Sequence, residues 1–319
     1  MATDHCGTLK DVSMTKLDLI VTPFFVQRLL ALFRCRCSLL LLPLLAGCLA
    51  TPASVQFLDS ATISDVRVWS GTVQIRGVVT VTKTGHLTIL PGTRIVFDKI
   101  DVDGDGIGDS ELLVEGSLVA KGTPTAPILF TSGAATPAKG DWKYLYLDFA
   151  RQAEVAHIIS EYAYSGIQVH FCRAEVVDSE FRHNIDGVRF STVNIEVRGN
   201  RIHNNTNGLR YEERRSTATI HDNDIVDNDI GIFVVTRSAD QARIVQNNIV
   251  GNRSYNVKLG LDQSGDVTLP DNWWGTTDPA AITRTFFDHK YDSSLGSVFA
   301  PAPLEQPVVL PQAQSPEGG

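Results

Sequence analysis

The chain has 319 residues, of which 43% are hydrophobic and 20% are charged, and its net charge is −8. That is an ordinary globular balance, and the length suffices for one large core. A negative surface argues against nucleic acid as a partner, because binding to phosphates needs clustered Lys and Arg. Removal of a leader would strengthen this argument, since residues 48–319 carry 23 basic and 33 acidic residues, a net charge of −10.

The N-terminus has the layout of a secretory signal. Three basic residues precede a short apolar run, "SLLLLPLLA", at residues 38–46. The run is too short for a membrane span, which needs about 20 apolar residues, and it matches the apolar centre of a signal peptide. The basic residues are Arg28, Arg34 and Arg36. We expect residues 1–25, which come before this pattern, to be an over-extended gene start.

The apolar run ends in Leu-Ala-Gly-Cys at residues 45–48, which resembles a bacterial lipobox. The resemblance implies that residues 1–47 are a leader, that Cys48 carries a lipid, and that residues 48–60 tether the folded domain. Leu49 follows the Cys, and an Asp there commonly marks Gram-negative lipoproteins for the inner membrane. The resemblance therefore favours the outer membrane. The alternatives are a plain signal peptide and a soluble protein with a buried apolar segment.

Cleavage would leave a single free thiol. Cys6, Cys35 and Cys37 would leave with the leader and Cys48 would be acylated, so no internal disulfide is expected. The remaining Cys172 follows the strand pattern "IQVHF" and is predicted to be a small buried side chain. Stability must then come from the hydrophobic core.

Three segments in the middle of the chain align with one another. They are "AEVVDSEFRHNIDGVRF" (174–190), "IEVRGNRIHNNTNGLRY" (195–211) and "ATIHDNDIVDNDIGIFV" (218–234). In each, an Asn is followed three residues later by a Gly, and these glycines are 21 and 23 residues apart. A shorter copy precedes the three and another follows. The Asn column is Asn184, Asn205, Asn228 and Asn252. The Gly column is Gly166, Gly187, Gly208 and Gly231, and Asn256 takes the place of the glycine in the copy that follows.

The repeats predict a parallel β-helix. Each unit has short β-branched stretches separated by Asn, Asp or Gly, and both Asn and Gly tolerate the left-handed backbone of a corner. Such units have no helical period and cannot bury an apolar face alone, so they must stack. We expect an all-β, single-stranded right-handed parallel β-helix of about ten coils, in which the Asn column forms a hydrogen-bonded ladder.

The acidic stretch "IHDNDIVDNDIGIFVV" (220–235) fits this scaffold better than a catalytic site. Paired carboxylates can act as acid and base, but the aligned coils do not repeat the acidic set. The predicted surface turn residues are Asp222, Asp224, Asp227, Asp229, His203 and His221.

Segments on both sides of the repeats resemble known β-helices. "VQIRGVVTVTKTGHLTILPGTRIVFD" (73–98) resembles the first coils, and "DNWWGTTDPAAI" (271–282) the closing phrase, of secreted proteins of the pectate-lyase-like superfamily. The resemblance is specific for the fold and weak for activity, because the superfamily contains many different enzymes and proteins without known chemistry. The expected boundaries are 61–300 for the β-helix, 270–300 for its cap and 301–319 for a disordered Pro-rich tail.

One loop matches the first nine positions of an EF-hand-type calcium loop, "DVDGDGIGDSE" (101–111). Carboxylates at this spacing, together with one carbonyl, can converge on one ion. The predicted Ca²⁺ ligands are Asp101, Asp103, Asp105, the carbonyl of Ile107, and Asp109. The pattern breaks at the twelfth position, where Leu112 replaces a bidentate Glu. The alternative is a solvated acidic hairpin, and in either case the loop is not expected to catalyse a reaction.

A row of outward-facing residues lies two places after each corner glycine. Stacking would place Arg189 above Arg210 and near Lys258, and such a cationic stripe can bind the carboxylates of an acidic polysaccharide. The full row is Gln168, Arg189, Arg210, Phe233 and Lys258. The alternative is that rows of this kind only neutralise neighbouring charges.

Two classes of function remain open. The Gly-Asp-Asp phrase of polygalacturonase-like members and the Asp-Pro-His-Asp phrase of mannuronan-epimerase-like members are absent. We therefore expect a monomeric, lipid-anchored envelope protein that binds a glycan or a surface protein, or has a structural role, without catalysis. The alternative is a polysaccharide lyase, hydrolase or epimerase acting on an acidic polysaccharide, with Arg189 or Arg210 as a base.

Overall fold

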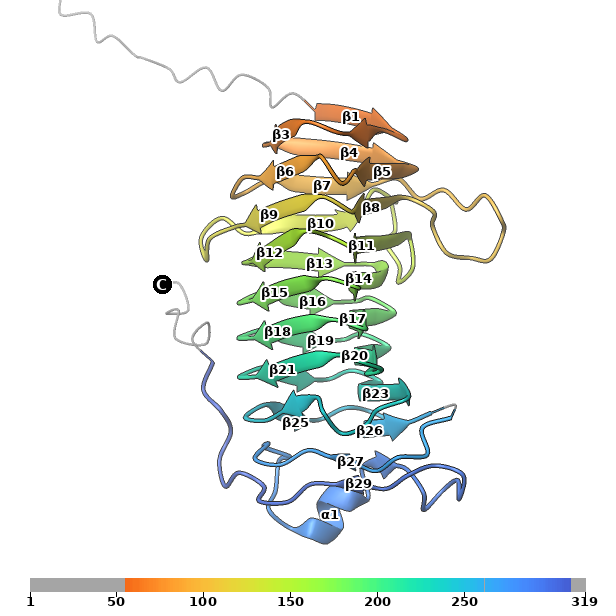
Figure 1. Cartoon of the computed structure of the whole chain (residues 1–319), viewed down its shortest axis with the longest axis vertical. Helices are drawn as coiled ribbons and strands as arrows, with labels where there is room; N and C mark the ends of the chain where they lie inside the picture. Colours follow the sequence, from red (N-terminus) through yellow and green to blue (C-terminus); the bar gives the residue numbers. More distant parts are fainter. Residues whose placement is uncertain (1–54, 261, 311–319) are drawn as a thin grey trace, which may run out of the picture. The chain divides into compact units, whose positions relative to one another are not determined.

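The computed structural model describes residues 55–260 and 262–310. The chain divides into two units, residues 1–49 and residues 50–319, and the expected leader with Cys48 lies outside the described residues. The described part of the second unit is a stack of coils (Figure 1), in which successive strands are added in turn to three long sheets. This arrangement confirms the predicted all-β parallel β-helix.

Every pairing between strands of neighbouring coils is parallel within the three long sheets. The nine-stranded sheet consists of β1 (Val55–Asp59), β4 (Thr72–Arg76), β7 (Arg94–Phe97), β10 (Ile128–Ser132), β13 (Ile158–Glu161), β16 (Glu180–Arg182), β19 (Arg201–His203), β22 (Asp224–Val226) and β25 (Asn248–Val250). The ten-stranded sheet consists of β2 (Thr62–Ile63), β5 (Val78–Val81), β8 (Glu111–Val114), β11 (Trp142–Asp148), β14 (Ala163–His170), β17 (Asp186–Ser191), β20 (Asn207–Glu212), β23 (Ile230–Thr236), β26 (Tyr255–Leu259) and β28 (Phe286–Phe287). The eight-stranded sheet consists of β3 (Val66–Trp69), β6 (His86–Ile89), β9 (Ser117–Lys121), β12 (Gln152–Ala156), β15 (Arg173–Val177), β18 (Asn194–Arg198), β21 (Thr217–His221) and β24 (Arg243–Ile244).

The core is a set of columns in which like side chains stack on one another. Strands alternate between inward and outward side chains, so each inward residue meets its counterpart in the next coil, about 4.8 Å away. Val176, Val197 and Ile220 pair in register as the repeats predict, and all three are buried. Phe190 and Tyr211 stack with ring centroids 5.1 Å apart and an interplanar angle of 6°. The hydrophobic core is therefore made of side-chain columns that run along the solenoid axis.

The Asn column lies inside a corner of the solenoid and forms a ladder. The Oδ1 atom of Asn205 accepts from the backbone N and the Nδ2 of Asn184 at 2.9 and 3.1 Å. Asn228 does the same for Asn205, and Asn252 for Asn228. A second ladder runs through Asn200, Asn223, Asn247 and Asn272. Each buried amide thus accepts a hydrogen bond from a backbone N–H of the neighbouring coil. At a corner, no sheet pairing is present to provide that partner.

The corner glycines allow this close approach. A Cβ on Gly208 would lie 2.7 Å from the Gly231 carbonyl and 2.8 Å from the Asn228 Nδ2 atom. No side chain fits there without moving the ladder.

The C-terminal end of the solenoid carries a cap. Helix α1 (Pro279–Thr283) begins after Asp278, whose carboxylate accepts from the backbone N of Ala280 and Ala281. Strands β27 (Val267–Thr268) and β29 (Val298–Phe299) form a separate pair. The Trp274 side chain is buried, and its ring contacts Phe286 at 5.2 Å.

Two boundaries differ from the sequence prediction. Residues 55–59, expected within the tether, form β1 and pair with all of β4. Residues 301–310, expected to be disordered, are folded as well. Val308 exchanges hydrogen bonds with the Asn248 side chain at 2.8 and 2.9 Å, and Leu310 is buried. These backbone partners fix segments whose composition alone indicates a linker.

Candidate functional site: the outer face of the ten-stranded sheet

The predicted outward row exists and lies on the ten-stranded sheet. Gln168, Arg189 and Arg210 pair in register across β14, β17 and β20, and Phe233 and Lys258 continue the row on β23 and β26. The corner glycines lie within these strands, and the side chains two places later are partly exposed except for that of Gln168, which is buried. Three positive charges and one aromatic ring therefore lie along four neighbouring coils.

A buried carboxylate underlies the arginine pair. Asp186 is fully buried, and its Oδ2 atom lies 3.1 Å from an Nη atom of Arg210 and 3.9 Å from one of Arg189. Its Oδ1 atom accepts from the Asn207 side chain at 2.7 Å. The carboxylate orients both guanidinium groups and neutralises one of their two charges. Sequence reasoning missed Asp186, although it directly precedes a corner glycine where the neighbouring coils carry Ser165 and Asn207.

Lys258 is separated from the arginine pair by an aromatic ring. The Phe233 ring lies between the two, with the Arg210 Cζ and the Lys258 Nζ each 5.6 Å from its centroid. Lys258 also lies over Phe287, at 5.3 Å. The expected stripe is therefore interrupted: the arginine pair lies on one side of the Phe233 ring and Lys258 on the other. Cation–π attraction to this ring stabilises Arg210 and Lys258.

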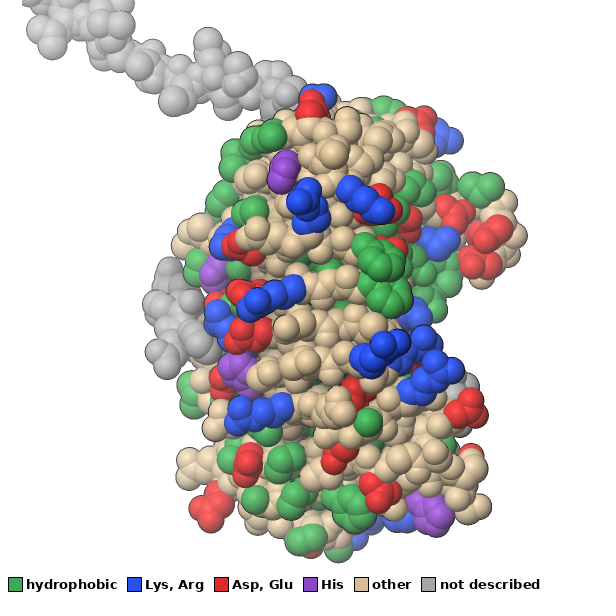
Figure 2. All heavy atoms as spheres, in the orientation of Figure 1, with side chains coloured by type: hydrophobic (Ala, Val, Ile, Leu, Met, Phe, Trp, Pro, Cys, Tyr) green, Lys and Arg blue, Asp and Glu red, His purple; other side chains and the backbone are tan. Residues whose placement is uncertain are grey.

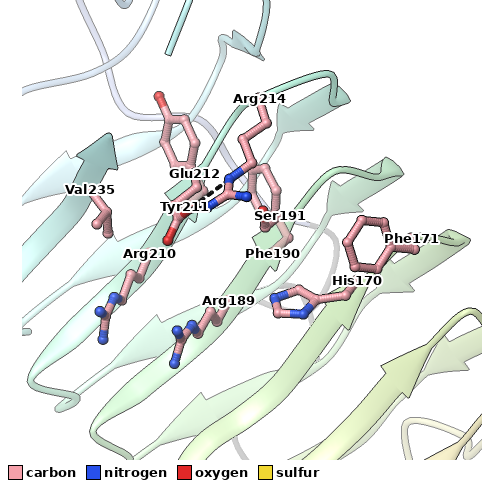
Figure 3. A pocket seen from close by; sticks show the side chains of 10 residues that line it. All are labelled: His170, Phe171, Arg189, Phe190, Ser191, Arg210, Tyr211, Glu212, Arg214 and Val235. Atoms are coloured by element: carbon pink, nitrogen blue, oxygen red, sulfur yellow. Dashed lines mark hydrogen bonds and ion pairs between the residues drawn. The ribbon is translucent and has the colours of Figure 1, made fainter. Parts of the chain in front are cut away.

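A hollow of about 180 Å³ lies beside the arginine pair, and we call it the sheet hollow. Figure 3 shows Arg189 and Arg210 extending side by side from adjacent strands, and His170 pointing toward Arg189. Its lining is His170, Phe171, Arg189, Phe190, Ser191, Arg210, Tyr211, Glu212, Arg214 and Val235. The sequence predicted only the two arginines of this lining. The other lining residues occupy positions where successive coils carry different residue types.

The charges in the sheet hollow are mostly fixed. Burial, followed by the nearby Arg189 charge, lowers the pKa of His170 to about 4, so the imidazole is neutral at pH 7. Its Nδ1 atom lies 3.0 Å from the Tyr146 hydroxyl, and burial raises the pKa of Tyr146 to about 12. Glu212 accepts from the Arg214 Nε at 2.8 Å. The arginine pair therefore supplies the surplus positive charge, and the hollow is suited to an anionic group.

The acidic loop brings together part of the predicted calcium set. One ligand atom from each of Asp101, Asp103 and Asp109 lies within 4.8 Å of the others. Asp105 accepts instead from the backbone N of Ile107 at 2.7 Å. The hydrogen bond from the Val102 backbone N–H lowers the pKa of the Asp109 carboxyl, and Lys143, which pairs with Asp109 at 3.2 Å, lowers it further. Figure 1 shows this loop projecting from the solenoid between β7 and β8.

Two of the predicted surface turn residues have other roles. His203 lies within β19, is 8% exposed, and contacts the Glu180 carboxylate through Nε2 at 2.9 Å. Asp224 lies in β22, where its carboxylate accepts from the Asn248 side chain at 2.6 Å. Both predictions were wrong because these side chains find partners in the neighbouring coil, which a single coil's sequence does not show.

The residues 125–293 match the family model described as periplasmic copper-binding protein (NosD). The match covers more than half of the chain and most of the coils. This chain belongs to the NosD family. No curated protein and no solved structure matches the NosD chain. Family membership agrees with an envelope-associated protein that has a binding or structural role. Along residues 55–260 and 262–310, no helix is both long enough and apolar enough to cross a membrane.

The side chains of this NosD chain do not fit a copper centre in the part that the structure describes. Copper binds thiolate, thioether and imidazole ligands, whereas carboxylates alone suit calcium, magnesium or manganese. Residues 55–310 contain no Met and a single Cys, Cys172. Burial raises the pKa of the Cys172 thiol to about 11, so it is protonated at pH 7. The seven histidines of the described residues belong to no set of three converging ligand atoms, and the one such set there belongs to the aspartates of the acidic loop.

Proposed function

We propose that this chain is a non-catalytic envelope protein that binds an acidic glycan on the outer face of the ten-stranded sheet. The observation that supports the proposal most directly is the Arg189–Arg210 pair on adjacent strands, oriented by the buried Asp186. Arginine side chains held in place before binding lose less conformational entropy when they bind a carboxylate. Such a pair suits the regularly spaced carboxylates of a uronic acid polymer.

The neighbouring aromatic rings support a sugar ligand. Tyr144 and Tyr164 contact each other edge to face at 5.7 Å, and the Arg189 Cζ lies 6.0 Å from the Tyr164 centroid. Phe233 and Phe287 flank Lys258 at the other end of the row. Rings beside cations offer apolar surface for a sugar face next to charge for its carboxylate. The strongly negative net charge elsewhere would restrict an acidic glycan to this face.

The test measures retention of acidic and neutral polysaccharides by the full chain carrying Cys48→Ser, with calcium or with a chelator. We expect acidic polysaccharides to be retained, and the R189A/R210A double variant to weaken binding about tenfold or more. Arg173→Ala is the matched control, because Arg173 is an exposed arginine on the eight-stranded sheet.

Loss of binding in the control as well, or no retention of any acidic polysaccharide, would contradict the proposal. Ultraviolet-absorbing unsaturated sugar ends in the same incubations would instead reveal a polysaccharide lyase. Retention of a protein partner alone would favour the structural role.

Two further parts of the proposal concern Cys48 and the acidic loop. Cys48 is proposed to carry a lipid that holds the protein at the outer membrane, and absence of radiolabelled fatty acid from the wild-type protein would contradict this.

The acidic loop is proposed to bind calcium weakly through Asp101, Asp103 and Asp109. Calorimetric titration with Ca²⁺ tests this. A heat of Ca²⁺ binding in the Asp103→Asn variant equal to that of the wild-type protein would contradict it.

A further inference from the structure

A second hollow lies at the corner where the ten-stranded sheet turns toward the eight-stranded sheet. This corner hollow has a volume of about 380 Å³ and is lined by Phe171, Thr192, Arg214, Arg215 and Arg237. It shares Phe171 and Arg214 with the sheet hollow. Figure 2 shows Lys and Arg side chains gathered on the flank of the solenoid at the level of β17 and β20. The two hollows are therefore neighbouring parts of one basic surface.

The corner hollow is lined by three arginines and by no carboxylate. Among the described residues, Arg215 and Arg237 form no ion pair, and Arg214 pairs with Glu212 of the sheet hollow. Two other carboxylates lie in this region, but neither lines the hollow. Glu213 is fully buried and accepts from the backbone N of Ala239, and the Asp240 carboxylate accepts from the Thr268 backbone N. Two of the three arginines that line the hollow, Arg215 and Arg237, therefore have no carboxylate partner in it.

The backbone fixes the corner positions of two of the arginines. Arg214 and Arg237 both have positive φ, +46° and +57°, and the Arg214 backbone N donates to the Arg237 carbonyl at 3.2 Å. The buried Glu213 carboxylate also accepts from the Ser238 hydroxyl in the next coil. These bonds stack the two corners one coil apart, about 4.8 Å. Residues with positive φ are uncommon, and Arg is not among those enriched there.

Phe171, which lines both hollows, belongs to an exposed aromatic pair. Phe171 is 48% exposed and stacks on Phe149, with ring centroids 4.6 Å apart and an interplanar angle of 14°. Phe149 is 57% exposed, so both rings form an apolar ledge on the outside of the solenoid. Exposed stacked rings beside unpaired arginines are suited to a flat ligand surface that continues into an anionic group.

The two hollows differ in the arginines that line them, and this difference indicates the ligand. The arginine pair shares one buried carboxylate, Asp186, and so matches a single further carboxylate. The corner hollow is lined by three arginines, two of them without an ion pair, and a phosphate monoester carries about −1.5 to −2 near pH 7. The guanidinium fork matches phosphate oxygens in a bidentate geometry.

We propose that the two hollows form one two-part site for a phosphorylated acidic glycan, with a sugar carboxylate on Arg189 and Arg210 and a phosphate monoester on Arg214, Arg215 and Arg237. The sugar between the two anionic groups lies against Phe171. This inference deepens the proposed glycan binding and rests on it.

Calorimetry on the full chain carrying Cys48→Ser tests the site. The probes are an oligouronate with one phosphate monoester, the same oligouronate after phosphatase treatment, inorganic phosphate, and phosphatidylcholine vesicles with and without phosphatidic acid. We expect the phosphorylated oligouronate to bind about tenfold tighter than the dephosphorylated one. The R215Q/R237Q variant, which keeps a Cβ at both exposed positions, should remove that difference. Arg173→Ala should leave it unchanged.

The outcomes separate this inference from the proposed function. If both oligouronates bind equally well, or if R215Q/R237Q weakens both equally, the phosphate site is wrong although glycan binding stands. If neither oligouronate binds but inorganic phosphate binds and R215Q/R237Q abolishes it, the corner site stands and the glycan function fails. Binding of phosphatidic acid vesicles without binding of the oligouronates would overturn the glycan as the source of the phosphate.

Discussion

At the scale of single residues, the charged groups on the nine-stranded sheet form a network across three coils. Glu180 contacts His203 at 2.9 Å and Arg182 at 2.9 Å, and Arg182 also pairs with Glu161 at 2.8 Å. Glu161 accepts in addition from the Thr131 hydroxyl at 2.8 Å. Because these side chains are largely buried, each charge depends on its partner more than a surface pair would.

The network predicts a pH dependence of stability. The hydrogen bond with His203 is the largest influence that lowers the pKa of Glu180 from 4.5 to about 2, and Arg182 adds to it. A lowered folded-state pKa stabilises the fold above pH 4.5, and this contribution is lost as the pH falls through about 2. Glu180→Gln should therefore reduce the free energy of unfolding at pH 7 by on the order of 2 kcal/mol.

Urea titrations between pH 7 and pH 2.5 check this, and the Glu180→Gln variant should show the shallower pH dependence. Glu175→Gln serves as the control, since Glu175 is exposed on the eight-stranded sheet. Equal flattening in both variants would show that the effect comes from net charge and not from the network.

On the faces and corners of the coils, single residues could be predicted where the neighbouring coils repeat them. The Asn column and the Arg189–Arg210 pair could be aligned because each recurs at the same place in successive repeats. Asp186 and His203 could not, because their neighbours in the column have different chemistry. Their roles depend on side-chain contacts between coils, which a register alone does not give.

At the scale of elements, the Asn ladder holds the corners together. Asn205 makes four bonds, accepting from the N and Nδ2 of Asn184 and donating to the Phe181 carbonyl and the Asn228 Oδ1. Asn205→Ala would leave buried donors and acceptors in three coils without partners. Each unsatisfied buried group costs about 1–3 kcal/mol, so we expect a loss of at least about 3 kcal/mol.

Equilibrium unfolding in urea measures the loss. Asn194→Ala is the matched control, because Asn194 begins a strand of the eight-stranded sheet and is exposed, and its loss should be below about 0.5 kcal/mol. Similar values for the two variants would mean that the ladder adds no more than surface packing.

The elements that the sequence did not predict are fixed by distant partners. Residues 301–310 are rich in proline, and composition alone favours a disordered tail. The Asn248 side chain, 60 residues earlier, nevertheless bonds both ways with the Val308 backbone. The acidic loop shows the opposite case, since local spacing predicted a set of ligands of which Asp101, Asp103 and Asp109 lie close together.

At the scale of the whole solenoid, each coil contacts mainly its neighbours, so stability should vary along the axis. The strand order of all three long sheets follows the chain, with each strand next to those of the adjacent coils. In such a stack, stability is roughly a sum of coil and interface contributions, and an end without a cap frays.

The C-terminal cap should therefore protect the coils next to it more than the distant ones. Trp274 is 3% exposed and contacts Phe286, the first residue of the last strand in the ten-stranded sheet. Trp274→Ala should cost about 3 kcal/mol or more and raise amide hydrogen exchange in β23 and β26. Exchange in β4 to β10 should change little, because many coils lie between. Phe299→Ala, at a cap residue that is 51% exposed, is the control and should leave both regions unchanged. If exchange instead rises equally along the solenoid, the coils unfold as one cooperative unit, and the cap then stabilises the arginine pair and both hollows as strongly as it stabilises its own neighbours.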